Sequence, residues 1–203
     1  MRTVLKKTVF MLALGLVSPF IAASWIEKRL SDCELIFTGI GQFLSVFPGL
    51  IGSYCRAAYY FGSLEKCSWE VHIGFGSFFT HRTASLGRHV AIGAYGVIGT
   101  AAIEEGTMIA SRVSITSGKR QHLDDDFKFI PKPRFDKVRI GQKTWIGEGA
   151  IIMANVGNGC IVSAGTVVVH DIPDGQIIAG NPGKPIKKSF HSVKNPSSTI
   201  NNA

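Results

Sequence analysis

The residues best suited to catalysis are histidines, and one of them, His122, stands in an unusual segment. From Gly118 to Lys137 the chain reads GKRQHLDDDFKFIPKPRFDK, a charged, proline-containing interruption of a glycine-rich, aliphatic region. Imidazole has an ordinary pKa near neutrality, so His122 could take a proton from a hydroxyl group. On the residues alone, a solvent-exposed loop histidine without a catalytic role is the competing interpretation.

Metal and disulfide chemistry are disfavoured by the spacing of the possible ligands. The cysteines, Cys33, Cys55, Cys67 and Cys160, are far apart, with no CxxC pair, and no histidines cluster in the sequence. A zinc site or a disulfide framework needs such clusters or pairs. We therefore expect reduced thiols in a cytosolic domain and no catalytic metal.

A six-residue repeat on both sides of this segment predicts the elements that position His122. Large apolar residues, mostly followed by small ones, recur at Ile73, Phe79, Leu86, Ile92, Ile98, Ile103, Ile109, Ile115, Ile140, Ile146, Ile152, Val162 and Val168. Each unit predicts a short strand with one inward residue and then a corner, where glycine relieves steric conflict. We expect stacked coils over 71–188, with a loop projecting at 117–138 and a flattened or bulged coil where Ile152 and Val162 are too close.

The first 70 residues differ in composition from the repeats and predict an apolar helical segment. Residues 8–26 carry no charge, and a second uncharged run covers 35–55. A cleaved signal peptide, a membrane hairpin and a soluble helical cap all fit such runs.

The net charge of +8 among 203 residues favours anionic partners. No basic patch is interleaved with aromatic residues, so nucleic acid is the weakest of these. Residues 189–203 form a polar tail.

The repeat resembles the hexapeptide-repeat acyltransferases over 71–188, and most specifically from Ile140 to Lys187, IGQKTWIGEGAIIMANVGNGCIVSAGTVVVHDIPDGQIIAGNPGKPIK. This stretch is similar to sugar O-acetyltransferases of surface polysaccharide synthesis. The leader ending in FPGLIGSYCRAAYY resembles membrane-associated members of that group. The resemblance implies a mainly β fold, a left-handed parallel β-helix, in a homotrimer that uses acetyl-CoA. It also implies a saccharide acceptor, which the apolar leader suggests is lipid-linked.

The resemblance also assigns the candidate site residues. His122 matches the general base, and the positions that would hold acetyl-CoA are Trp145, Ala164, Gly165, Lys184 and Lys187. Trp145 would pack beside the thioester, Ala164 and Gly165 would line the groove for the pantetheine arm, and the two lysines would bind the nucleotide phosphates. GNPGKP departs from the commoner form of the motif around the first lysine.

Two further residues are candidates for contacting the acceptor or orienting His122, namely His81 and Glu148. The acids Asp124, Asp125 and Asp126 are alternatives for the orienting role. The predicted function is O-acetylation of a sugar on the cytoplasmic face of the inner membrane, where acetyl-CoA is present. N-acetylation of an amino sugar or small amine, and a non-catalytic membrane-bound scaffold, remain the alternatives.

Overall fold

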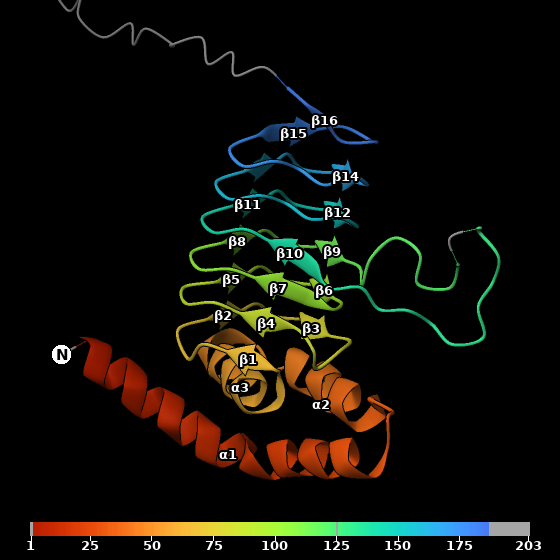
Figure 1. Ribbon diagram of the computed structural model, residues 1–203. Coiled ribbons are helices and arrows are strands. Elements are labelled where there is room, and N and C mark those ends of the chain that lie inside the picture. The colour runs from red at the N-terminus through yellow and green to blue at the C-terminus, as the bar shows by residue number, and fades with distance from the viewer. Residues whose placement is uncertain (1, 125, 187–203) are drawn as a thin grey trace, which may run out of the picture.

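The protein, seen in a computed structural model that describes residues 2–124 and 126–186, is a stack of coils standing on a helical base. Figure 1 shows the coils rising from the helices, with one long loop projecting to the side. The predicted tail and Lys187 lie outside the described residues. A mainly β, parallel β-helix with an apolar helical segment at the N-terminus was predicted, and the structure confirms it.

Three helices precede the coils: α1 (Arg2–Leu30), α2 (Leu35–Ser45) and α3 (Gly49–Ser63). The long helix α1 lies beneath the other two, and α3 packs across its middle (Figure 1). Helix α2 contacts β3 and helix α3 contacts β2, so both pack on the first coil. The first strand begins at Lys66, before the predicted start of the repeats at 71.

The coils form three parallel sheets, named here A, B and C, and each coil visits them in that order. Sheet A contains β1 (Lys66–Cys67), β4 (Ser85–Leu86), β7 (Ala101–Ile103) and β10 (Val138–Ile140). Sheet B contains β2 (His72–Ile73), β5 (Ala91–Ile92), β8 (Met108–Ile109), β11 (Trp145–Ile146), β13 (Ile161–Val162), β15 (Ile177–Ala179) and the antiparallel β16 (Lys184–Pro185). Sheet C contains β3 (Phe78–Phe79), β6 (Val97–Ile98), β9 (Ser114–Ile115), β12 (Ile151–Ile152) and β14 (Val167–Val168).

The interior of the prism is filled by the large residue of each repeat. Every residue that the six-residue beat marks as inward, from Ile73 to Val168, is at most 3 % exposed. In register, Ile92 pairs with Ile73 below and Ile109 above, so identical side chains stack along the axis. A single coil could not bury its apolar face, and stability therefore comes from stacking neighbours.

The glycines after the inward residues have a different role from the one that the sequence suggests. At Gly74, Gly93 and Gly147 an added Cβ would approach backbone atoms of the next coil to 2.4–2.6 Å, so close stacking requires glycine there. The positive φ angles fall two residues further on, as at Gly76 and Tyr95. The glycine directly after the inward residue thus allows close stacking of coils, and the residue two positions later turns the corner.

The short step between Ile152 and Val162, for which the sequence predicts a flattened or bulged coil, is taken up at one corner. After Ile152 the chain reaches sheet A at Val156, which bridges in parallel to Ile140 and Ile172. The corner between sheets C and A is therefore shorter here, while the stacking on both sides is retained. This C–A corner is also where the long loop is inserted.

The helical base closes the lower end of the prism through buried polar side chains. The Arg56 guanidinium donates to the Leu44, Phe47 and Ile73 carbonyls, which ties the end of α2 to β2. Burial lowers the pKa of Arg56. Burial raises the pKa of Tyr60, and its hydroxyl oxygen accepts a hydrogen bond from the backbone N–H of Phe79. These contacts fix the helices to the first coil.

Candidate functional site

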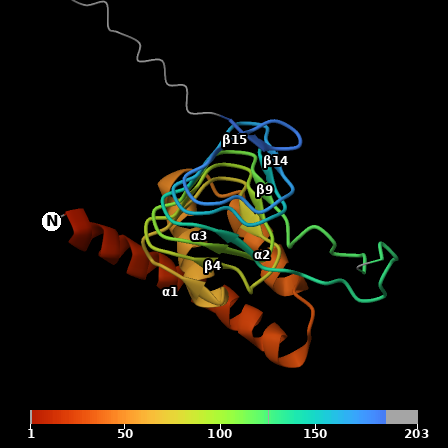
Figure 2. The same cartoon turned by 45° about the horizontal axis from the view of Figure 1, so that its top comes forward.

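The polar loop, residues 117–138, leaves the C–A corner after β9 and returns at β10. Figures 1 and 2 show it extending away from the prism wall. Its two legs are held together by backbone hydrogen bonds: Ile130 donates to the His122 carbonyl at 3.0 Å, and Arg134 donates to the Gln121 carbonyl at 2.8 Å. The loop therefore has a defined path on which His122 occupies the outgoing leg.

The His122 side chain is exposed on this loop. The nearby Asp124 carboxylate accepts hydrogen bonds from the backbone N–H groups of Asp126 and Lys128, both at 2.9 Å. It thus closes its own turn. Asp125 lies outside the described residues. Asp124 accordingly shapes the loop, and the exposed imidazole is available to a molecule that docks against it.

His81 lies at the same corner, after β3, and contacts the returning leg of the loop. Its Nδ1 is 2.7 Å from Glu34 Oε2, and its ring centroid is 4.1 Å from that of Phe135. Burial would raise the pKa of Glu34, but hydrogen bonds from His81 and the Arg82 backbone hold it below its ordinary value. The structure therefore places His81 beside the loop, with its orientation fixed by a carboxylate from the α1–α2 connection.

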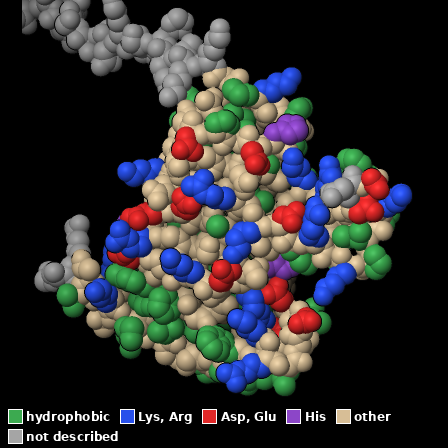
Figure 3. Space-filling view, viewed as in Figure 1, with side chains coloured by type: hydrophobic (Ala, Val, Ile, Leu, Met, Phe, Trp, Pro, Cys, Tyr) green, Lys and Arg blue, Asp and Glu red, His purple; other side chains and the backbone are tan. Residues whose placement is uncertain are grey.

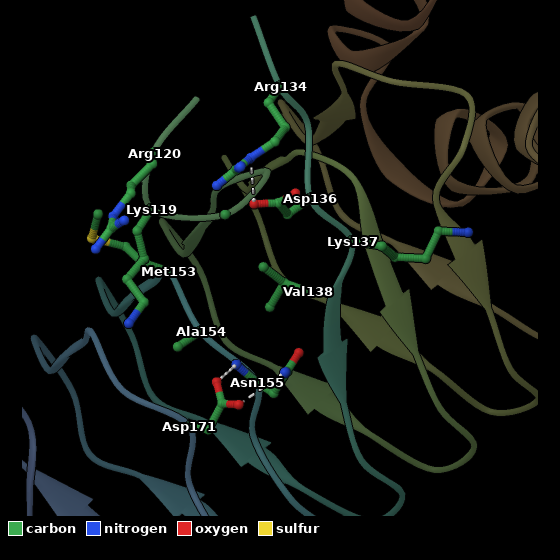
Figure 4. Close-up of a pocket in the computed structure, with 11 residues that line it drawn as sticks. Lys119, Arg120, Arg134, Asp136, Lys137, Val138, Met153, Ala154, Asn155 and Asp171 are labelled. Atoms are coloured by element: carbon green, nitrogen blue, oxygen red, sulfur yellow. Dashed lines mark hydrogen bonds and ion pairs between the residues drawn. The ribbon is translucent and has the colours of Figure 1, made fainter. Parts of the chain in front are cut away.

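A cavity of about 250 Å³ opens at the root of the polar loop (Figure 4). Basic side chains predominate in its lining, with Lys119, Arg120 and Arg134 beside Asp136 and Asp171, whereas Lys137 turns away and pairs with Glu65 at 2.7 Å. Arg134 Nε is 3.4 Å from Asp136 Oδ2. The surplus of positive charge suits an anionic group.

The floor of this cavity is an asparagine–aspartate ladder that sequence reasoning missed. Asn155 donates its backbone and side-chain N–H groups to Asp171 at 3.0 and 3.2 Å. Asn158 and Asp174 repeat the pattern at the A–B corner. Hydrogen bonds from Asn158 lower the pKa of Asp174. The signal available in the sequence was the equal spacing of sixteen residues in both pairs.

The residues predicted to hold acetyl-CoA gather on sheet B and the adjoining B–C corner. Trp145 lies half-exposed on β11, and Lys184 is exposed on β16 of the same sheet. Ala164 and Gly165 form the corner between β13 and β14, where Gly165 has a φ of 68°. The β15–β16 turn lies next to this corner, because Gly183 donates to the Val167 carbonyl. Lys187 is outside the described residues.

Glu148 lies one coil below Gly165 on the same corner, and its backbone carbonyl accepts from the Gly165 N–H at 2.8 Å. Its carboxylate pairs with Arg112 Nη2 at 2.7 Å on the exposed surface. His122, in contrast, is on the loop that leaves the C–A corner. Within one chain, Glu148 and the acetyl-CoA candidates are therefore at a different corner from His122.

Metal ligation has no support among the residues that the structure describes, since no group of three or more His, Cys, Asp or Glu side chains could hold an ion. The four cysteines are free thiols, with Cys33 exposed and the others buried.

One helix, at residues 3–30, is long and apolar enough to cross a membrane.

Sequence comparison finds relatives among acetyltransferases, whereas no family model matches. The chain is 37% identical over 101 residues to a protein of Escherichia coli K12 named as a lipopolysaccharide biosynthesis O-acetyl transferase, WbbJ, covering 43% of this chain and 50% of that one. It is 37% identical over 79 residues to a Staphylococcus aureus tetrahydropyridine-dicarboxylate N-acetyltransferase, covering 36% and 33%. The chain thus spans half or less of the length of these relatives.

Solved structures share the fold. A maltose O-acetyltransferase from Clostridium difficile matches with a TM-score of 0.65 at 20% identity, over 76% of this chain and 85% of that one. A galactoside acetyltransferase in complex with coenzyme A matches with a TM-score of 0.64 at 17% identity, over 77% and 84%. The chain is therefore similar in fold to solved acetyltransferases and similar in sequence to proteins that are named as acetyltransferases.

Proposed function

We propose that the protein transfers an acetyl group from acetyl-CoA to a hydroxyl group of a sugar in cell-surface polysaccharide or glycolipid synthesis. His122 accepts the hydroxyl proton as the oxygen attacks the thioester carbonyl. The new C–O bond forms, the C–S bond breaks, and the imidazolium returns the proton to the CoA thiolate. The products are an acetyl ester and free CoA, and no metal is needed.

The observation that carries this proposal is the placement of two half-sites at different corners of one prism. The exposed His122 belongs to the C–A corner, while Trp145, Gly165 and Lys184 belong to sheet B and the B–C corner. In a cyclic homotrimer each interface joins two different surfaces of neighbouring subunits. Three prisms standing side by side would bring the polar loop of one against the acetyl-CoA side of the next.

Charge and composition around the two half-sites agree with these substrates. Lys184 on β16 suits a nucleotide phosphate, and the half-exposed Trp145 offers an apolar wall for the thioester. His81, oriented by Glu34 beside the polar loop, is a candidate for contacting the acceptor hydroxyl. The apolar helix α1 favours a lipid-linked acceptor at the cytoplasmic face of a membrane, where acetyl-CoA is available.

The catalytic role of His122 is tested by following release of free thiol from acetyl-CoA in the presence of candidate saccharides. We expect His122→Asn to lower the rate by about 10²- to 10⁴-fold, the usual contribution of a general base. His89→Asn, at an exposed histidine on the A–B corner, is the matched control and should keep full activity. A trimeric His122→Asn variant with the wild-type rate would refute the assignment.

A mixing experiment tests whether the site is shared between subunits. His122→Asn and Ala164→Glu, which blocks the proposed pantetheine groove, should each be inactive alone. After the two are unfolded and refolded together, about a quarter of the interfaces in random trimers join two intact half-sites. Recovery of about that fraction of activity is expected. No recovery from properly formed mixed trimers would place both halves in one chain.

N-acetylation is the second candidate, because a relative is named as an N-acetyltransferase. The two products differ chemically, since mild alkali cleaves acetyl esters and leaves acetamides intact. We expect the label transferred from radioactive acetyl-CoA to be released by alkali. A label that survives this treatment would favour an amine as the acceptor.

A further inference from the structure

Helix α1 is apolar on both sides, although only one side is covered by the rest of the chain. The covered stripe includes Phe10, Ala13 and Val17, which pack under α3 at a helical spacing. The opposite side is also apolar and is exposed at Val4, Leu5, Met11, Leu12, Leu16, Trp25, Ile26 and Leu30. These eight residues are called here the apolar base. A helix that is apolar all round is normally covered all round.

Exposed apolar residues continue from α1 onto α2 and the residues that follow it. Phe20 of α1 contacts Phe43 at 6.1 Å between ring centroids, and Phe43 contacts Phe47 at 5.2 Å. Phe43 and Phe47 are themselves exposed large hydrophobic residues. Figure 3 shows green side chains gathered over the lower part of the molecule, where the helices lie. A continuous apolar patch of this kind marks an interaction surface.

Basic residues stand near both ends of the apolar base, and none lies in its middle, between Met11 and Ile26. Lys6 and Lys7 precede the uncharged stretch 8–26, and Lys28 and Arg29 follow it. The first acid after the stretch, Glu27, is buried in an ion pair with Arg82. An apolar surface flanked by lysine and arginine complements the acyl region and the anionic headgroups of a bilayer. A second copy of the same surface would oppose like charges instead.

The inner side of α1 cannot leave the protein without breaking buried polar contacts. Arg82 donates to the Ser24 carbonyl at 2.9 Å and to Glu27 Oε2 at 2.6 Å, while Glu27 also accepts from the N-terminus of α2. If α1 crossed the membrane, the ion pair between Glu27 and Arg82 would either lie in hydrocarbon or be broken, and both have a high free-energy cost. Contacts of α2 with β3 also hold the end of α1 beside the coils.

We propose that α1 lies in the plane of an anionic bilayer, with the apolar base in the boundary between headgroups and acyl chains, and does not cross it. Length and composition alone would equally fit a membrane span. This inference builds on the membrane association proposed above. In a trimer of parallel prisms the three copies of the apolar base would face one membrane plane, and their combined binding would be stronger than that of one copy through avidity.

Vesicle binding tests the surface, and it measures no acetyl transfer, so this inference and the proposed function can fail separately. The full chain should float with vesicles of phosphatidylcholine and phosphatidylglycerol and bind pure phosphatidylcholine more weakly. Leu12→Gln and Leu16→Gln keep good helix formers at positions that are 71% and 67% exposed. We expect each to weaken binding by about tenfold, and Lys6→Gln and Lys7→Gln by about fivefold each.

Tyr95→Asn is the matched control, since it removes an exposed aromatic residue from the B–C corner of the second coil, outside the three helices, at a positive φ that asparagine tolerates. It should bind vesicles like the wild type. Flotation of the Leu12→Gln/Leu16→Gln protein equal to that of the control would overturn the proposal. So would self-association through this face without any vesicle binding.

Thiol labelling separates lying in the membrane from crossing it. Cys33 is exposed just beyond the end of α1, whereas Cys55, Cys67 and Cys160 are buried. Thr3→Cys adds a thiol at the other end of the helix. In inside-out vesicles from expressing cells, a membrane-impermeant maleimide should label both positions without detergent, and Cys33→Ser gives the background. Labelling of either position only after detergent is added would show that α1 crosses, and would refute the in-plane arrangement.

Discussion

Glu27 offers a sharp test of how the helical base is joined to the coils. Its side chain and that of Arg82 are only 5% and 8% exposed. Its carboxylate accepts three hydrogen bonds: from the backbone N–H of Ile36 at 2.6 Å, from that of Phe37 at 3.0 Å, and from Arg82 Nη2 at 2.6 Å. Glu27→Gln keeps the shape of the side chain but replaces one acceptor oxygen with a donor. At least one of the three donors must then lose its partner.

The magnitude follows from these contacts. Breaking a buried ion pair typically costs about 3–5 kcal/mol, and one hydrogen bond to a charged group contributes about 1.5–3 kcal/mol. Arg82 keeps the Ser24 carbonyl and Glu34 Oε1, at 2.9 and 3.1 Å, so its charge is not left alone. We therefore expect a loss near the lower end, about 3 kcal/mol. For a chain of this size that corresponds to a fall in Tm of roughly 6–12 °C.

Thermal unfolding followed by far-UV circular dichroism measures this loss. The matched control is Glu105→Gln, which removes a carboxylate paired with Arg88 at 3.1 Å on the surface, where the side chains are 44% and 64% exposed. An exposed pair of this kind contributes at most about 1 kcal/mol. If Glu27→Gln lowers the Tm no more than Glu105→Gln does, the buried network does not fasten the helices and the reasoning is wrong.

Two further predictions concern stability. The pKa of Glu34, which burial alone would raise, is held below its ordinary value of 4.5 by hydrogen bonds from His81 and Arg82, so its stabilising effect is present above that pH and is lost as the pH falls below it. The difference in Tm between the wild type and Glu34→Gln should therefore be largest near neutrality and shrink as the pH is lowered through this range; a constant difference would contradict this. Ile146→Ala, in the fully buried column, should cost about 2–5 kcal/mol in urea unfolding. Ile151→Ala, on the outer face of the next strand, should cost much less, and equal losses would contradict the inward and outward assignment.

The inward column could be predicted because the repeat makes it a local property. Ile92 and Ile146 each follow the preceding inward residue by six positions, and stacking then fixes their environment. The same regularity predicted the interruption after Ser117. The short step between Ile152 and Val162 could also be predicted, but spacing along the chain does not reveal which of the two corners in that range is the shorter one.

Contacts between distant segments could not be predicted in the same way. Glu34 reaches His81 across 47 residues, and Arg56 serves carbonyls from both α2 and β2. Neither pairing could be predicted from a repeat, because the three helices do not contain the six-residue repeat of the coils. His81 was singled out, but its carboxylate partner and its contact with Phe135 depend on how two non-repeating segments fold against the first coil.

The division of the candidate site follows from the geometry of a three-sided coil. Residues at equivalent repeat positions stack on one corner, as Arg112, Gly149 and Gly165 do, where each later residue belongs to the next coil. A groove built from the repeats therefore stays on one side of the prism. His122 lies outside the repeat, on a loop that leaves a different corner. The proposed function joins these elements by placing another copy alongside, so we expect assembly and catalysis to be lost together when subunit contacts are broken.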